Sequence, residues 1–160
     1  MALFRRDIFD EIRDDHRQVM DIFDQLLQTD AVTIRRRPQL MNQLQSELLA
    51  HMAAEESVFY PLLENGERNH WNHLKAEEEH VSARLVLDRL QQMHPNEEHF
   101  AALCDVLRNV IRMHVAEEES VLFLTVRSHI SNQQTMDLIQ PFQAAKDSFR
   151  RQQRPVRRAA

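Results

Sequence analysis

One short motif occurs twice in the sequence. The stretch HMAAEESVFY begins at His51, and HVAEEESVLF begins at His114, 63 residues later. In each copy a glutamate follows the histidine by four positions, as Glu55 and Glu118. Residues i and i+4 lie on the same face of an α-helix, one turn apart. The repeat therefore predicts two similar helices, each of which presents a histidine and a glutamate on one face.

A second repeated element accompanies the first. The stretch DDHRQ around His16 resembles EEHVS around His80, 64 residues later. Each half of the chain thus contains a helix with two acidic residues before a histidine, followed by a helix with the His-x-x-x-Glu motif. Such halves are expected to form two helical hairpins related by a pseudo-twofold axis.

The composition favours helices throughout. The 160 residues include one glycine and five prolines, and the good helix formers Leu, Glu, Gln, Arg and Ala are abundant. Pro38 suits the first turn of a helix, and Gly66 suits the end of one. Ser131 with Gln134 resembles a capping box, and Pro141 should kink or divide the helix that follows. Apolar spacing near 3.6 predicts five helices, at about residues 6–28, 38–64, 70–93, 97–127 and from 131 onward.

The predicted fold is all-α. Long helices joined by about four to ten residues fold back as antiparallel neighbours, which indicates an up-down-up-down four-helix bundle with an additional C-terminal helix across its outside or one end. We expect residues 1–130 to form the bundle and residues 131–160 to form the extra helix and a basic tail. Pro61 should bend the second helix, and Leu124 stands at the matching position of the fourth, so the two copies should differ in shape.

The repeated polar residues should meet inside this bundle, because they share faces with apolar stripes. The stripes after the two glutamates are expected to continue through Val58, Leu62, Val121 and Thr125. An ionised carboxylate in an apolar interior costs several kcal/mol unless it is paired, and iron, manganese and zinc bind imidazole and carboxylate well. Two carboxylates could then bridge two ions, each bound by two histidines. The predicted ligands are His16, His51, Glu55, His80, His114 and Glu118.

The alternative interpretation is structural. A single His-x-x-x-Glu on a helix is usually a surface ion pair, and a lone histidine on an apolar stripe is more often a hydrogen-bonded core residue. A metal-free bundle in which these residues satisfy one another, or a histidine phosphotransfer domain, would follow. Two motifs with two further histidines at matching offsets favour metal binding, and four inward histidines fit phosphotransfer poorly.

Other polar residues are expected outside the site. Glu56 and Glu119 follow the proposed bridging residues by one position and should point away. Tyr60 is expected to pack in an interface, although it could also reach the site from the next turn of the helix. Glu77 is expected to be a solvated acid, although its spacing from His80 would also allow it to add an oxygen ligand. Four histidines at segment ends or in loops are expected to be exposed: His70, His94, His99 and His129.

These motifs resemble those of the hemerythrin-like family, also called HHE cation-binding domains. The resemblance covers roughly residues 6–127 and rests on DDH, HMAAE, EEEH and HVAEE. It implies a non-haem, oxo- or hydroxo-bridged di-iron centre in the bundle, with Mn or Zn as substitutes. Glu55 and Glu118 would bridge the two irons. His16 and His51 would bind one iron, and His80 and His114 the other.

The chain departs from the oxygen-carrying members of that family at two positions. Their fifth histidine, one turn before the equivalent of His80, is replaced by Ala76. Glu118 follows His114 by four residues, where they have a spacing of five. One ion would therefore be more open, and water, Glu77 or an exogenous molecule would fill the gap.

Two functions follow from such an open site. The first is binding of O2 or a related small molecule, peroxide or NO, with two-electron exchange and, in an enzymatic variant, peroxidase- or oxidase-like turnover. The second is an iron- or redox-responsive regulator, in which metal occupancy controls bundle stability and the C-terminal helix or tail reports it to a partner.

Charge and cysteine content limit the possible binding partners and cellular location. The net charge is −5, but residues from Lys146 onward hold six basic residues against one acidic, so the remainder carries 14 basic and 24 acidic residues, a net of −10. Such an acidic body argues against nucleic-acid binding, while the basic tail could contact a protein partner. The single Cys104 and the lack of a membrane-spanning apolar run predict a cytoplasmic protein.

Overall fold

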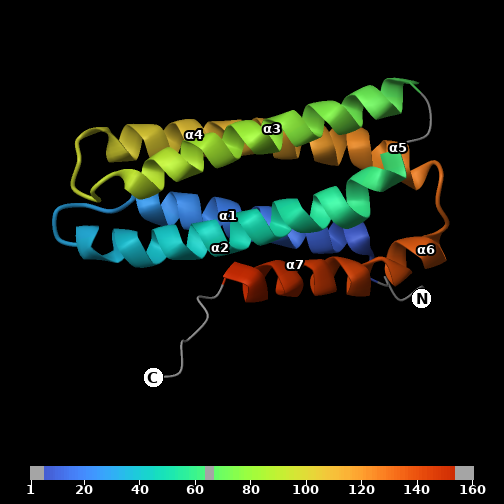
Figure 1. Cartoon of the computed structure of the whole chain (residues 1–160), viewed down its shortest axis with the longest axis horizontal. Coiled ribbons are helices and arrows are strands. Elements are labelled where there is room, and N and C mark those ends of the chain that lie inside the picture. The colour runs from blue at the N-terminus through green and yellow to red at the C-terminus, as the bar shows by residue number, and fades with distance from the viewer. Residues whose placement is uncertain (1–5, 64–66, 154–160) are drawn as a thin grey trace, which may run out of the picture.

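The computed structural model describes residues 6–63 and 67–153. Four long helices run up, down, up and down, as predicted (Figure 1). They are α1 (Ile8–Leu27), α2 (Arg37–Ala54), α3 (Glu67–Gln92) and α4 (His99–Glu117). Shorter elements follow or precede them, namely η1 (Ile34–Arg36), η2 (Glu55–Phe59), η3 (Tyr60–Leu63), η4 (Glu118–Leu122), α5 (Phe123–Arg127), α6 (Asn132–Asp137) and α7 (Ile139–Gln153). Gly66, predicted to end the second helix, lies outside the described residues.

Local sequence explains where these helices begin and divide. Asp7 accepts a hydrogen bond from the amide of Asp10 in a capping box that begins α1. Ser131 and Gln134 form the predicted capping box of α6. The last helix divides between α6 and α7, three residues before Pro141. Proline has no N–H for the carbonyl four residues earlier and its ring clashes there, so this break is the predicted effect.

Both copies of the repeated motif continue into a turn of π-helix, η2 and η4. The amides of Tyr60 and Phe123 donate to the carbonyls of Glu55 and Glu118 respectively. A π turn adds one residue to the helix and is often found at functional sites. The copies then differ, as expected, because Pro61 lies in the 3-10 helix η3 and the second copy continues as α5.

The π turns correct the predicted inward stripe. Val121 is 41% exposed, while the next residue, Leu122, is buried. In the first copy Val58 and Leu62 are half-buried, whereas Phe59, Tyr60 and Leu63 are fully buried. The stripe predicted from i+3 spacing was therefore displaced by one residue, because the π turn rotates the following side chains.

Two apolar clusters fill the bundle along its length. One contains Val19, Phe23, Leu44, Leu87 and Leu107. The other lies around the π turns and is rich in aromatic rings, including Phe9, Phe59, Phe123 and Phe142. Ile12 belongs to the second cluster and Val19 to the first, so the level of His16 on α1 falls between them. Polar groups at that level are enclosed by apolar packing on both sides.

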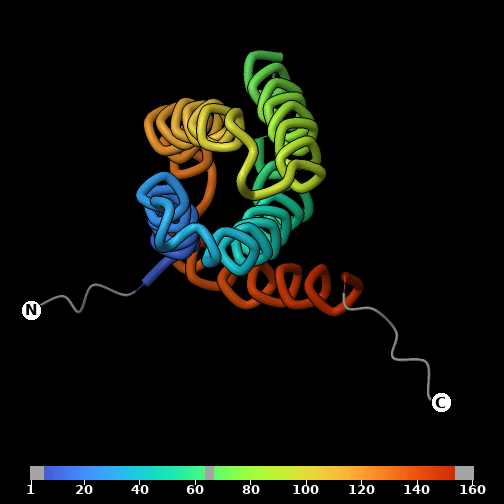
Figure 2. Tube along the Cα trace, turned by 90° about the vertical axis from the view of Figure 1, so that its left-hand side faces the viewer, coloured from blue at the N-terminus to red at the C-terminus, as the bar shows by residue number. Residues whose placement is uncertain are grey.

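Helix α7 packs outside the bundle along α2 (Figures 1 and 2), as the sequence predicted for the C-terminal segment. Phe142 is fully buried in the aromatic cluster. The ammonium of Lys146, itself buried, forms an ion pair with Asp15 of α1. Gln143 donates to Glu11 Oε1 at 3.0 Å. The predicted domain boundary at residue 130 falls between α5 and α6. None of the described helices has the length and apolar character needed to cross a membrane.

Candidate metal centre

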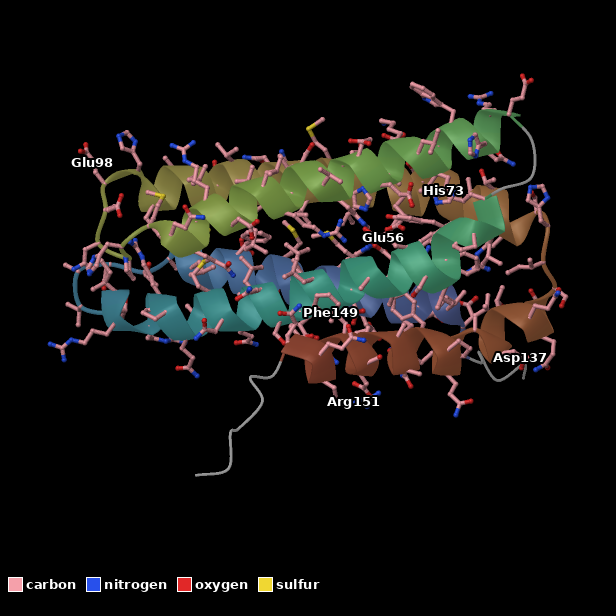
Figure 3. All side chains as sticks on the ribbon, viewed as in Figure 1. Glu56, His73, Glu98, Asp137, Phe149 and Arg151 are labelled. Carbon is pink, nitrogen blue, oxygen red and sulfur yellow. The ribbon has the colours of Figure 1, made fainter. Side chains whose placement is uncertain are left out.

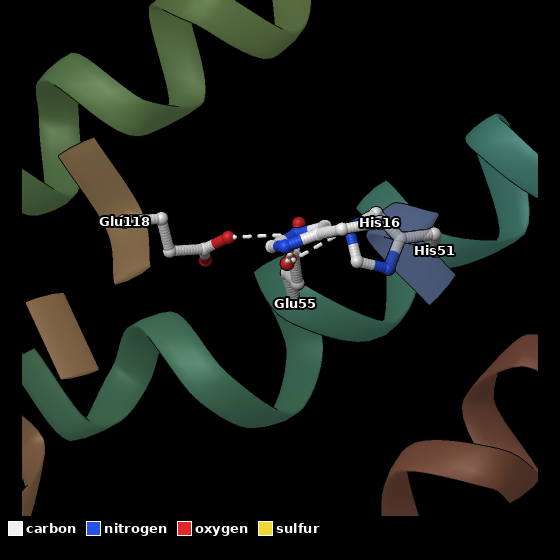
Figure 4. Close-up of side chains that lie close together, drawn as sticks. All are labelled: His16, His51, Glu55 and Glu118. Carbon is white, nitrogen blue, oxygen red and sulfur yellow. Dashed lines mark ion pairs between the residues drawn. The ribbon is translucent and has the colours of Figure 1, made fainter. Parts of the chain in front are cut away.

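Six buried polar side chains from α1, α2, α3, α4 and the two π turns converge inside the bundle, and Figure 4 shows four of them. None is more than 5% exposed. Their potential ligand atoms form two groups whose members lie within 4.8 Å of one another. The first group is His16, His51, Glu55 and Glu118, and the second is Glu55, His80 and His114. The structure therefore brings together all six residues that the sequence singled out.

Both glutamates lie between two pairs of histidines, His16 and His51 from the first half of the chain and His80 and His114 from the second. Glu55 Oε1 is 2.9 Å from His51 Nε2, and Glu55 Oε2 is 3.3 Å from His80 Nε2. Glu118 Oε2 is 3.1 Å from His16 Nε2 and 3.9 Å from His114 Nε2. Each carboxylate thus faces a histidine of both halves, which is the placement that a bridging ligand requires.

Each of the four histidines also has a carboxylate at its other ring nitrogen. His16 Nδ1 lies 2.8 Å from Glu119 Oε1, and His80 Nδ1 lies 2.8 Å from Glu56 Oε1. Since an ionised carboxylate only accepts, each ring donates from Nδ1. The other two pairs are His51 Nδ1 with Asp15 Oδ2 at 3.2 Å and His114 Nδ1 with Glu79 Oε2 at 2.8 Å.

These four acids were not recognised as part of the site from sequence. Glu56 and Glu119 were predicted to point away, and that prediction missed their contacts with histidines on neighbouring helices. For Asp15 and Glu79 a signal was present, because both belong to the repeated element of two acids before a histidine. That element does not indicate that they contact His51 and His114. A carboxylate on Nδ1 fixes the orientation of the ring and directs Nε2 at the centre, as the partners of metal-binding histidines do.

Tyr60 reaches the centre, contrary to the prediction that it packs in an interface. It is fully buried, and Oη lies 3.0 Å from His80 Nε2 and 3.3 Å from His114 Nε2. It also donates to Glu55 Oε2 at 3.5 Å. The π turn explains the error, because it rotates Tyr60 onto the inward face. Tyr60 therefore adds a hydroxyl that faces the second group of ligands.

The remaining polar residues are placed as follows. Glu77 pairs with His73, at 3.3 Å between Oε1 and Nε2, and its side chain is 44% exposed. It belongs to neither group of converging residues. The four histidines predicted to be exposed are exposed: His70, His94, His99 and His129.

Buried polar atoms without hydrogen-bond partners test whether the cluster suits a metal. They include His16 Nε2, Glu55 Oε1 and both carboxylate oxygens of Glu118. Some of these atoms lie within ion-pair range of one another, but none is aligned for a hydrogen bond. Such atoms are costly in a protein interior unless something binds them. Four imidazoles and two shared carboxylates form a donor set that suits two iron, manganese or zinc ions.

In the metal-free protein, protons on the histidines supply positive charge that bound metal ions would otherwise supply. Burial lowers the pKa of His16, but the carboxylates of Glu118 and Glu119 outweigh it and raise this pKa well above its ordinary value. For His80, Glu55 and Glu56 likewise outweigh burial and raise the pKa to about 9. The pKa of Glu55 is lowered, because the surrounding histidines outweigh its burial. Metal binding must displace the histidine protons, so it should be favoured at higher pH.

Because protons occupy these histidines in the absence of metal, the stability of the metal-free protein should depend on pH. The pKa of His80 is raised from 6.5 to about 9 on folding, so its protonation stabilises the fold fully below pH 6.5. That contribution, about 3 kcal/mol by linkage, is lost as the pH rises through 9. We expect the Tm, followed by circular dichroism in a chelator, to fall by several degrees over this window. Metal-loaded protein should not show the fall, and a metal-free Tm that stays level would contradict the prediction.

The carboxylate partners can be tested individually. Glu119→Gln removes the charge that holds His16 Nδ1–H while keeping the size of the side chain. We expect metal affinity to fall roughly 10- to 100-fold, as is typical when such partners of ligand histidines are changed. Affinity is measured by competition with a chromophoric chelator. Glu98→Gln, at an exposed position in the α3–α4 connection (Figure 3), is the control and should leave affinity unchanged. Equal affinities for the two variants would show that Glu119 has no part in orienting the ring.

Comparisons with known proteins agree with the geometry. The family model described as hemerythrin HHE cation binding domain matches residues 7–126. A protein of Nostoc sp. named DNA nickase is 29% identical over 145 residues, which are 89% of this chain but only 40% of that protein. A hemerythrin-like protein of Schizosaccharomyces pombe is 28% identical over 141 residues, 87% of this chain and 68% of that protein.

A solved structure has the same fold. It is that of a hemerythrin HHE cation binding domain-containing protein from Mycobacterium kansasii, with a TM-score of 0.80. The match covers 92% of this chain and 90% of that chain at 17% sequence identity. At this identity the likeness establishes the arrangement of helices alone.

Proposed function

This chain belongs to the hemerythrin HHE cation-binding family, and we propose that it holds two iron ions and binds O2 or a related small molecule at them. The observation that supports this most is the placement of Glu55 and Glu118, each facing histidines of both halves. The two carboxylates would hold both ions. His16 and His51 would also bind one ion, and His80 and His114 the other. Mn or Zn can replace iron in such a donor set.

A bound di-iron pair would supply two electrons for exchange with O2, peroxide or NO. The protein would contribute enclosure of the site and a hydrogen-bond donor. The two apolar clusters enclose the site from both ends of the bundle. Burial and the charges of Glu55 and Glu118 raise the pKa of Tyr60 well above its ordinary value, so its hydroxyl keeps its proton. Ala76, 3% exposed, supplies no ligand beside His80. Tyr60 Oη is then a hydrogen-bond donor beside His80 and His114, in the half of the site where Ala76 leaves a ligand position unfilled.

The test starts from protein loaded anaerobically with two Fe²⁺ per chain. Admission of O2 or peroxide should produce a new near-ultraviolet and visible absorption band, because an oxidised, bridged pair absorbs there. Binding alone consumes about one equivalent of oxidant, whereas peroxidase- or oxidase-like turnover continues to consume it. Iron-loaded protein whose spectrum does not change with O2, peroxide or NO would contradict the proposal.

A second candidate function is an iron- or redox-responsive regulator, and one set of contacts favours it. Helix α7 touches the site through Asp15, which accepts from His51 Nδ1 and pairs with Lys146. The ring of Phe142 also lies 6.2 Å from that of His51, edge on. A change at His51 on loss of metal would therefore act directly on α7. The basic tail after Gln153 lies outside the described residues, so its contact with a protein partner remains a prediction. The cytoplasmic location is also still a prediction.

A further inference from the structure

A buried metal site needs a path by which the ion enters. The described residues leave two small cavities against the ligands. One is lined by the four ligand histidines together with Val19, Leu48, Met52, Ile111 and Val115. Its remaining walls are apolar, so it offers a hydrated cation no replacement for its water, and desolvating an ion there is costly. This cavity is unsuited to be the entry.

The other cavity is a polar crevice between α3 and the end of α4. It reaches from Asn72 and Lys75 past Ala76 to the buried ligands His114 and Glu118. The side chain of Lys75 is 41% exposed, so the crevice begins at the surface. The small side chain of Ala76 leaves the space open at the position where a larger residue would fill it.

Carboxylates line this crevice from its mouth to the site. The ammonium of Lys75 pairs with Glu117, whose side chain is 36% exposed, and lies 3.4 Å from Glu79 Oε1. Glu79 in turn accepts from His114 Nδ1 at 2.8 Å, and Glu118 lies further inward. Lys75 therefore occupies, with its own positive charge, the place between two carboxylates that a cation would take.

The other half of the pseudo-symmetric bundle is closed at the corresponding place. The repeat offsets of 64 and 63 residues put Ile12 where the second half has Ala76, and Ala54 where it has Glu117. Ile12 and Ala54 are both completely buried. The carboxylate of Asp15, which corresponds to Glu79, is neutralised by the buried Lys146 of α7. Helix α7 thus covers the first half, and the polar opening lies in the second.

We propose that the crevice beside Ala76 is the route by which a divalent cation enters the buried site, with Glu117 and Glu79 as its first ligands and Lys75 as a gate. This proposal rests on the proposed function only in requiring that the six buried residues bind metal. An arriving cation displaces the Lys75 ammonium, is held by the two carboxylates, and passes to His114 and Glu118. The ammonium then returns and closes the mouth.

The test uses Co²⁺ as the probe, added to metal-free full-length protein and followed by the visible absorption of the bound ion in a stopped-flow instrument. Lys75→Met should speed uptake by roughly tenfold and Glu117→Gln should slow it by a similar factor, the lower end of electrostatic effects on association rates. Ala76→Ile, which copies Ile12, should slow uptake further. Arg108→Met is the matched control, because it breaks a part-exposed ion pair with Asp24 elsewhere between two helices, and its uptake should equal that of wild type.

The final Co²⁺ content separates the two proposals. All four variants should reach the wild-type content, since none of the changed residues is among the six ligands. Unchanged rates in both Lys75→Met and Glu117→Gln, with normal final content, would overturn the entry route and leave the metal site intact. Wild-type protein that binds no Co²⁺ at any time would overturn the metal site itself.

Discussion

The Glu55→Ala variant is expected to lose both metal ions. Among the described residues Glu55 alone belongs to both groups of converging ligands, and its two oxygens face His51 and His80. Without it each ion loses a charged ligand, and Glu118 alone is left between the two ions. Metal content by elemental analysis should fall from about two ions per chain, the number such a bundle site holds, to well below one. The near-ultraviolet band of the bridged pair should disappear.

The control for this variant is Glu78→Ala, which removes an exposed carboxylate from α3. It should keep the full metal content and spectrum. Circular dichroism checks that both variants stay helical, because the apolar clusters do not depend on Glu55. A Glu55→Ala protein that retained two ions per chain would show that the bridging assignment is wrong.

Removal of the metal is the second change with a large expected effect. A ligand that binds only the folded protein stabilises it by about 4 kcal/mol at a concentration a thousand times its Kd. For a chain of this size that corresponds to a fall in Tm of roughly 10 °C on chelation. If the chain is a regulator, α7 should also loosen, because Lys146 holds Asp15 and Asp15 holds His51. Limited trypsin digestion should then cleave α7 faster in the metal-free protein.

Lys146→Met separates these two effects. It removes the link between α7 and Asp15 but leaves the six ligands in place, so chelation should still lower the Tm. Cleavage of α7 should be fast with or without metal in this variant. A wild-type digestion pattern that is the same with and without metal would remove the regulatory function and leave the proposal of small-molecule binding.

The sequence predicted the bundle and the six converging residues for one physical reason. Helical periodicity fixes which residues share a face, and the two repeats fix which helices correspond. His51 and Glu55 had to point in one direction, and the second copy had to match it. Helix bounds were correct to within a few residues because Pro38, the Ser131 capping box and Pro141 act locally on the backbone.

What the sequence did not reveal depends on contacts between helices. The Glu119–His16 and Glu56–His80 pairs join different halves of the chain, so no spacing within one helix indicates them. Tyr60 was misplaced because i+3 and i+4 counting assumes a regular α-helix, and a π turn follows each bridging glutamate. The crevice beside Ala76 also required the packed structure, since a small residue reveals an opening only when its neighbours are known.

Anomalous X-ray diffraction at the iron edge, from crystals of the iron-loaded protein, shows directly whether the bundle holds two irons. We expect two peaks inside the bundle, each about 2 Å from its ligand atoms, with Glu55 and Glu118 contacting both. One peak should lie beside His16 and His51, and the other beside His80 and His114. A single peak, or iron bound away from these six side chains, would contradict the central claim.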